Sequence, residues 1–114
     1  MDSQFSPANS DEPYYAVIFA NQLSNDPENA GLYGKTADRM VELATAQPGF
    51  LGVDSTRSAE GFGITVSYWK DMESIKIWRD HAEHKIAQAM GKKRFYEAFS
   101  LRISKVESTR FWES

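Results

Sequence analysis

Hydrophobic and polar residues alternate in the manner of half-buried β-strands along two neighbouring segments, Phe50–Arg57 and Phe62–Trp69. The residues between them, Ser58 to Gly61, have the composition of a hairpin turn. An earlier segment, Tyr14–Leu23, is rich in β-branched and aromatic residues and is apolar on both faces at its centre. The pattern therefore predicts three strands, of which the first is covered on both sides.

A fourth strand is predicted over Leu101–Phe111. Its alternation slips between Ile103 and Val106, which indicates a β-bulge or a change of strand partner at that point. The preceding stretch, Lys92–Phe99, is rich in aromatic residues and is interpreted as a connection with room for another turn or two of helix.

Helical periodicity marks two further regions. In the first, Gly31–Gln47, apolar residues form one stripe, and Pro48-Gly49 ends the helix; the stripe consists of Tyr33, Ala37, Met40, Val41 and Ala44. The second region begins after Asp71, whose carboxylate can cap free N–H groups of a first helical turn. Its apolar pattern predicts two short pieces, Met72–Arg79 and Ala82–Met90.

The predicted order is β-α-β-β-α-β, which is the order of the ferredoxin-like fold of the α+β class. In this arrangement four strands form an antiparallel sheet with both helices on one face. The strands carry apolar residues at both odd and even positions, so the sheet face without helices is also apolar. Such apolar faces are rarely exposed in soluble monomers. The pattern therefore predicts a homodimer that pairs these sheet faces across a two-fold axis.

Length and composition limit the class of protein. The 114 residues suffice for one domain, with residues 1–12 expected to form a flexible N-terminal tail and residues 13–114 a single domain. The net charge of −3 argues against a nucleic-acid partner. No apolar run is long enough to span a membrane, no secretory signal begins the chain and cysteine is absent, so a cytoplasmic protein without a membrane partner is expected.

Several short motifs resemble the antibiotic biosynthesis monooxygenase family of dimeric α+β barrels, in particular a small bacterial branch whose substrate is unsettled. The motifs are Gln47-Pro48-Gly49-Phe50-Leu51-Gly52, Val66-Ser67-Tyr68-Trp69-Lys70-Asp71 with Trp78 and His84, and Lys93-Arg94-Phe95-Tyr96 leading into Leu101-Arg102-Ile103. The resemblance implies dimerisation through the sheets and a pocket between sheet and helices in each subunit. It also implies, for some members, oxidation of aromatic polyketides by O2 without metal, flavin or haem.

The resemblance assigns catalytic roles to three residues. The amide of Asn21 would hold a substrate oxygen, the indole of Trp69 would wall the pocket, and His84 would take a proton. Each also has a structural interpretation: a strand-end cap for Asn21, a core aromatic for Trp69 and an ordinary surface or core histidine for His84. Substrate-binding roles are assigned to Trp78, Tyr68 and His81, with core packing as the alternative.

No metal or other cofactor is predicted. His81 and His84 have helical spacing, but a good metal site would need a third ligand. In the haem-binding branch of the family the axial histidine follows the helix tryptophan by ten residues, and ten residues after Trp78 stands Gln88, a poor iron ligand. Arg57, Arg94 and Arg102 fit either an anionic substrate or exposed ends of elements.

The sequence therefore leads to one hypothesis and two alternatives. The hypothesis is a cofactor-independent monooxygenase acting on a small, flat aromatic or polyketide-like substrate that is easily deprotonated. The first alternative is a non-catalytic dimeric protein that binds a small apolar molecule. The second is a haem-binding or haem-degrading monooxygenase.

Overall fold

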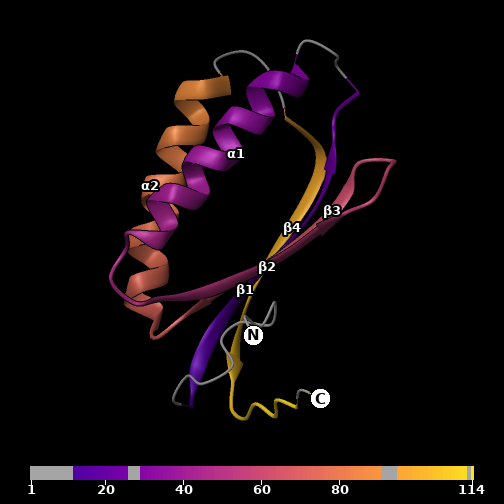
Figure 1. Cartoon of the computed structure of the whole chain (residues 1–114). Coiled ribbons are helices and arrows are strands. Elements are labelled where there is room, and N and C mark those ends of the chain that lie inside the picture. The colour runs from indigo at the N-terminus through magenta and orange to yellow at the C-terminus, as the bar shows by residue number, and fades with distance from the viewer. Residues whose placement is uncertain (1–11, 26–28, 91–94, 113) are drawn as a thin grey trace.

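The computed structural model describes residues 12–25, 29–90, 95–112 and 114, and the side chains of these residues except 29–33, 83, 84 and 86–90. Four strands and two helices follow one another in the predicted order (Figure 1). In chain order they are β1 (Tyr14–Leu23), α1 (Asn29–Thr45), β2 (Phe50–Arg57), β3 (Phe62–Trp69), α2 (Met72–Met90) and β4 (Tyr96–Val106). The predicted tail, residues 1–12, lies outside the described residues except for Glu12.

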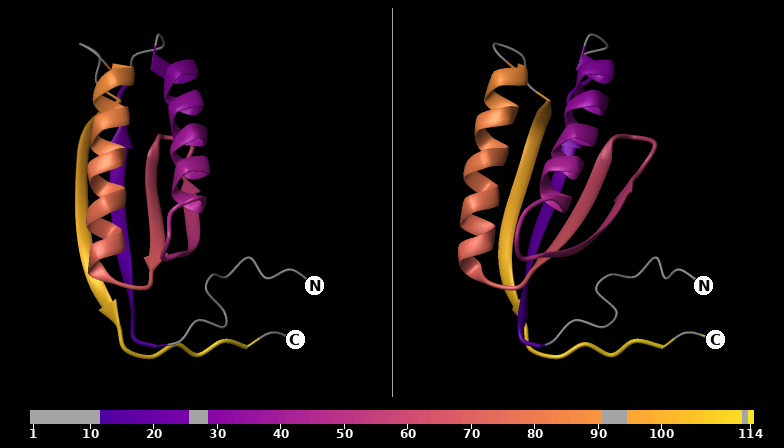
Figure 2. Two further views of the ribbon diagram at one scale, coloured as in Figure 1. Left: turned by 90° about the vertical axis from the view of Figure 1, so that its left-hand side faces the viewer. Right: turned by 60° about the vertical axis from the view of Figure 1, so that its left-hand side comes forward.

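The strands form one antiparallel sheet in the order β2-β3-β1-β4, which confirms the ferredoxin-like α+β fold. Both helices lie on the same face of this sheet (Figure 2). Tyr15 and Val17 of β1 pack against the helix-side core. Because side chains alternate along a strand, Phe19 and Asn21 also project from the helix face, while Ala16, Ile18 and Ala20 project from the opposite face.

The second helix differs from its prediction, because α2 is continuous from Met72 to Met90 rather than broken into two pieces. Asp71 caps it as expected, since the backbone N–H of Ser74 donates to Asp71 Oδ1 at 2.7 Å. Hydrogen bonds from Ser74 also lower the pKa of Asp71. In α1, Ala44 of the predicted stripe is buried but Val41 is exposed, so the buried face is narrower than the pattern indicated.

The last strand begins five residues earlier than predicted and ends at Val106. Tyr96, Ala98 and Phe99, expected in a connection, pair with β1, while Glu107–Phe111 lie beyond the strand. The predicted slip between Ile103 and Val106 is also wrong, because that part of the register is regular. The irregularity lies instead at Gln22/Leu23 of β1, which face Ala98 and Tyr96. Glu97 is therefore the extra residue of a bulge.

The buried core lies towards one end of the sheet. Trp69, at the end of β3, is completely buried and clusters with Ile75 and Ala44 from the helices. The ring of Trp78 stacks on Trp69 with centroids 6.0 Å apart, and Phe50 meets Trp69 edge-on. Away from this cluster, the β2–β3 hairpin bends away from the helices (Figure 1).

The face without helices is mixed. Tyr14 and Ala16 are buried, and Phe62 and Ile64 are exposed by 48% and 37% of their surface. No helix within the described residues has the length and hydrophobicity that crossing a membrane requires.

Candidate functional site

Asn21 has a buried amide that is only half satisfied. Its side chain is 2% exposed, near the end of β1 on the helix face. Its Oδ1 accepts a hydrogen bond of 2.8 Å from Nη2 of Arg57. Its Nδ2 has no hydrogen-bond partner among the described residues. Since buried donors are nearly always paired in folded proteins, an unpaired amide here indicates a place where a ligand oxygen would bind.

The orientation of this amide follows from chemistry. A guanidinium group carries only donors, so Arg57 can pair with the carbonyl oxygen of Asn21 and not with its nitrogen. The NH2 group must therefore point away from Arg57. A second contact fixes the guanidinium, because Nη1 of Arg57 donates to the carbonyl oxygen of Gly61 at 2.6 Å.

Aromatic side chains lie beside Asn21 on the same face. Phe99 of β4 is directly across from Asn21, and Phe19 is two residues back along β1, or about 7 Å. Phe19, Tyr96 and Phe99 form a cluster with ring centroids 5.3 to 6.2 Å apart. The bulge at Glu97 permits this cluster, because it places Tyr96 on the same face as Phe99 despite their odd spacing.

The opposite flank of Asn21 is polar. Arg57 is on β2, and the next pair on the helix face is Ser55 and Thr65, whose hydroxyl groups are hydrogen-bonded at 2.8 Å. Asn21 thus stands at a boundary between an aromatic surface on β1 and β4 and a polar surface on β2 and β3. A flat molecule with one polar edge matches this division.

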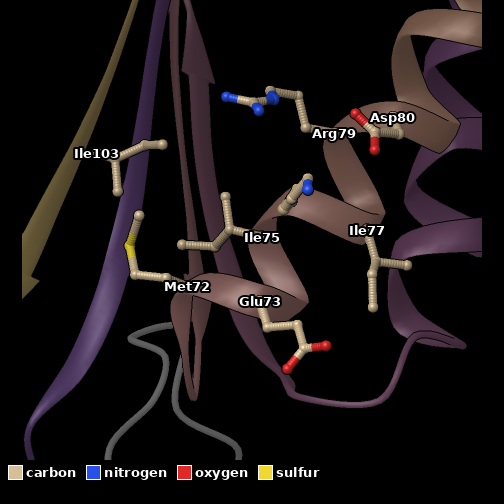
Figure 3. Close-up of a pocket in the computed structure, with 8 residues that line it drawn as sticks. Met72, Glu73, Ile75, Ile77, Arg79, Asp80 and Ile103 are labelled. Carbon is tan, nitrogen blue, oxygen red and sulfur yellow. The ribbon is translucent and has the colours of Figure 1, made fainter.

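A groove of about 630 Å³ lies between α2 and β4. Met72 and Ile75 from α2 and Ile103 from β4 point toward one another there, and Arg79 reaches across above them (Figure 3). Ile103 shares its face of β4 with Leu101 and Phe99, and all three are exposed. The apolar strip therefore runs from the groove to the residue opposite Asn21. We place the candidate site at Asn21, because the unpaired buried donor is there.

Trp69 and Trp78 lie at the other end of the sheet. Trp69 pairs with Tyr15 whereas Asn21 pairs with Gly63, which places them six residues apart along β1, or roughly 20 Å. The indole N–H of Trp69 donates to Ser67 Oγ at 2.9 Å. The structure therefore does not bring Trp69 and Asn21 together, and both tryptophans pack in the core.

The remaining predicted residues are dispersed. His81 is exposed on α2, and the side chains of His84 and Gln88 are outside the described residues, as is all of Arg94. Tyr68 projects from the face without helices, where its hydroxyl donates to Asp54 Oδ2 at 2.9 Å. Burial, together with the hydrogen bond to Asp54 and its charge, raises the pKa of Tyr68 to about 12. Among the described residues no three His, Asp or Glu side chains gather to hold a metal.

Sequence reasoning missed the partners of Asn21. Arg57 was considered only as a general anion-binding candidate, and Phe19 and Phe99 were not singled out. The available signal was the register of the β2–β3 hairpin, which places the last residue of β2 opposite Gly63. The bulge that brings Tyr96 to the cluster has no clear local signature.

Comparisons with known proteins agree on a family. The family model described as antibiotic biosynthesis monooxygenase matches residues 16–90. The uncharacterized protein YqjZ of Bacillus subtilis (strain 168) is 52% identical over 101 residues, covering 89% of this chain and 86% of YqjZ.

Solved structures show the same fold at low identity. The monooxygenase from the gene ActVA-Orf6 of Streptomyces coelicolor, in complex with nanaomycin D, superimposes with a TM-score of 0.67 and 12% identity, covering 96% of this chain and 100% of that chain. A mutant of SnoaB from Streptomyces nogalater, described as a cofactor-independent oxygenase, gives a TM-score of 0.66 and 10% identity, covering 84% and 95%.

Proposed function

Since the chain belongs to the antibiotic biosynthesis monooxygenase family, we propose that it is a monooxygenase that oxidises a small, flat, easily deprotonated aromatic molecule with O2 and needs no cofactor. Support for this reaction class comes from the family match and from the described neighbours, one of which is a cofactor-independent oxygenase. The substrate class follows from the side chains around Asn21.

The unpaired NH2 group of Asn21 is the observation that carries the proposal. An aromatic ring stacked on Phe19 and Phe99 would place an oxygen attached to that ring beside the Asn21 amide, because Phe99 faces Asn21 across the sheet. The N–H would then stabilise negative charge that develops on that oxygen as the substrate loses a proton. A preorganised donor is typically worth about 3 kcal/mol to such a step once water is excluded from the site.

The proposed reaction uses the substrate as the electron donor. Removal of a proton from an anthrone gives an enolate, and the enolate passes one electron to O2. The two radicals combine to a peroxide anion at the ring carbon, and this anion takes back the proton from the protonated base. The resulting hydroperoxide loses water to give the quinone. One oxygen atom of O2 enters the product and the other leaves as water. We assign the base to His84 of α2, whereas Trp69 and Trp78 pack in the core roughly 20 Å from Asn21 and take no part in the proposed step.

Oxygen uptake with an anthrone in metal-free buffer tests the proposal. The wild-type protein should consume O2 faster than buffer, and Asn21→Ala should lose most of that excess. Asn25→Ala is the matched control, since Asn25 is exposed just after β1. No excess uptake by the wild type, or equal uptake by Asn21→Ala, would contradict it. An anthrone that raises the melting temperature without being consumed would instead support a binding protein.

The proposal includes a homodimer formed through the sheet faces without helices. Phe62 and Ile64 expose apolar surface there, next to Ile18 and Val66 in the middle strands. Light scattering of the purified chain should give twice the subunit mass, and Ile64→Glu should shift it towards one subunit. Val41→Glu is the matched control, because Val41 is also apolar and exposed but lies on α1. One-subunit mass for the wild type at high concentration would refute the dimer.

A further inference from the structure

Three residues from neighbouring strands form one row across the sheet. Asn21 of β1 pairs with Gly63 of β3, and Gly63 pairs with Arg57 of β2. Arg57 and Asn21 are therefore separated by a whole strand, yet their side chains are hydrogen-bonded. The side chain of Arg57 must pass over β3 to make this contact, and it does so at the glycine.

Gly63 provides the space for that crossing. A Cβ atom built on Gly63 would lie 2.7 Å from Cζ of Arg57 and 2.9 Å from both Nη atoms. Any side chain at this position would therefore displace the guanidinium. The φ angle of Gly63 is not positive, so the backbone itself would accept alanine. The requirement for glycine comes from Arg57 and not from the backbone.

The contact matters because it determines what Asn21 offers to a ligand. A free asparagine side chain can turn either its oxygen or its nitrogen towards a ligand. Here the cation of Arg57 holds the oxygen, and Gly61 holds the cation in place from the other side. The charge also polarises the amide, which makes its N–H a stronger donor.

We propose that Arg57, admitted by Gly63, is a positioning residue that fixes Asn21 as a hydrogen-bond donor and makes the site select an oxygen anion, an enolate or phenolate, over the neutral form of the same molecule. This inference rests on the proposed function for its site and deepens it by naming the residue that orients Asn21 and gives the site its preference for the anion. A neutral carbonyl needs only the donor, whereas an anion also gains from the positive charge behind it.

Binding of a β-hydroxyanthraquinone tests the inference without turnover. This flat phenol is already oxidised at the ring carbons, and its phenol and phenolate forms absorb at different wavelengths. The wild-type protein should bind it as the phenolate and lower its apparent pKa. Arg57→Met keeps the apolar stem but removes the charge and the donors. It should raise the apparent pKa of the bound dye by about one unit, back towards its value in buffer, which is a tenfold loss of preference for the anion.

Gly63→Ala separates position from charge. It leaves Arg57 in the protein but pushes the guanidinium off Asn21, so it should reproduce the effect of Arg57→Met. In the double variant Gly63→Ala/Arg57→Met, the alanine should add nothing, because it acts only through Arg57. Gly34→Ala is the matched control: a Cβ there meets nothing within 4 Å, and the dye pKa should stay as in the wild type.

The outcomes separate this inference from the proposed function. If the wild type shows the dye shift and loses it in both variants but consumes no O2, the monooxygenase proposal fails and the inference holds. If O2 uptake is normal and both variants bind the phenolate as the wild type does, the inference is overturned and the function stands. Additive effects of the two substitutions, or failure of the wild type to bind the dye, would also overturn the inference. Circular dichroism checks that each variant is folded.

Discussion

Removal of the Tyr68 hydroxyl should abolish a specific loss of stability at alkaline pH. Tyr68 donates to Asp54 on the sheet face without helices, and its pKa is raised from 10.0 to about 12. An acid whose pKa is higher in the folded state holds its proton more tightly there, so its contribution is complete below pH 10. The free energy of unfolding must then fall as pH rises through 10 towards 12.

The size of this effect follows from the shift and from exposure. A shift of two units corresponds to roughly 2.7 kcal/mol if fully expressed. Tyr68 and Asp54 are both partly exposed, so solvent screening reduces this to about 1 kcal/mol. Burial is the first cause of the shift and the hydrogen bond to Asp54 the second, so Asp54→Asn should remove only part of it.

Denaturant unfolding at a series of alkaline pH values measures the effect. The wild type should lose about 1 kcal/mol more than Tyr68→Phe between pH 9 and pH 12, although Tyr68→Phe should be the less stable protein at neutral pH. Tyr15→Phe is the matched control, because it removes the hydroxyl of another partly buried tyrosine of the sheet. Parallel pH profiles for the wild type and Tyr68→Phe would refute the reasoning.

Three further predictions concern the core, the helix cap and haem. Ile75→Ala should lower the free energy of unfolding by about 2 to 3 kcal/mol, near the low end of the usual range for this change, because the groove beside Ile75 lets the site relax, and Ile75→Val should lower it by about 1 kcal/mol. Equal denaturation midpoints for the wild type and Ile75→Ala would contradict this. Asp71→Ala should lower the melting temperature, and the difference from wild type should shrink as pH falls through the lowered pKa of Asp71, since the capping carboxylate is then protonated; a constant difference would argue against the cap. Titration with haemin should leave the Soret band unshifted, and a saturable shift lost in His84→Ala would instead favour the haem alternative.

The first and last residues of three strands were predicted correctly because turn residues beside them fix where the strands begin and end. Arg57 and Phe62 flank a turn that contains Gly61 with a φ of 91°. Gly49, with a φ of 88°, lies directly before the second strand. The order of elements then left few alternatives to the ferredoxin-like fold.

The two misplaced elements depend on information that is not local. The helix α2 continues through Asp80 and His81 because backbone hydrogen bonds do not require an unbroken apolar stripe, and the apolar pattern alone suggested a break. The strand β4 ends at Val106 because its partner β1 begins at Tyr14. Its start was hidden by the bulge at Glu97, which disrupts the alternation that identifies a strand.

The candidate site was predictable only in part. Asn21 could be selected from the resemblance, and its burial agrees with a position facing the interior. Its pairing with Arg57 depends on the register of three strands and on the missing side chain of Gly63, which no local pattern specifies. The same register separates Trp69 from Asn21, although the resemblance grouped them.

Isotopic labelling of the product under heavy-oxygen gas tests the central proposal most directly. If the protein is a monooxygenase, mass spectrometry of the quinone formed from an anthrone should show one heavy oxygen atom per molecule. The initial rate at which labelled quinone forms should depend on the wild-type protein and should be nearly lost in Asn21→Ala. Quinone oxygen derived only from solvent water, or labelled quinone formed equally fast without the protein, would contradict it.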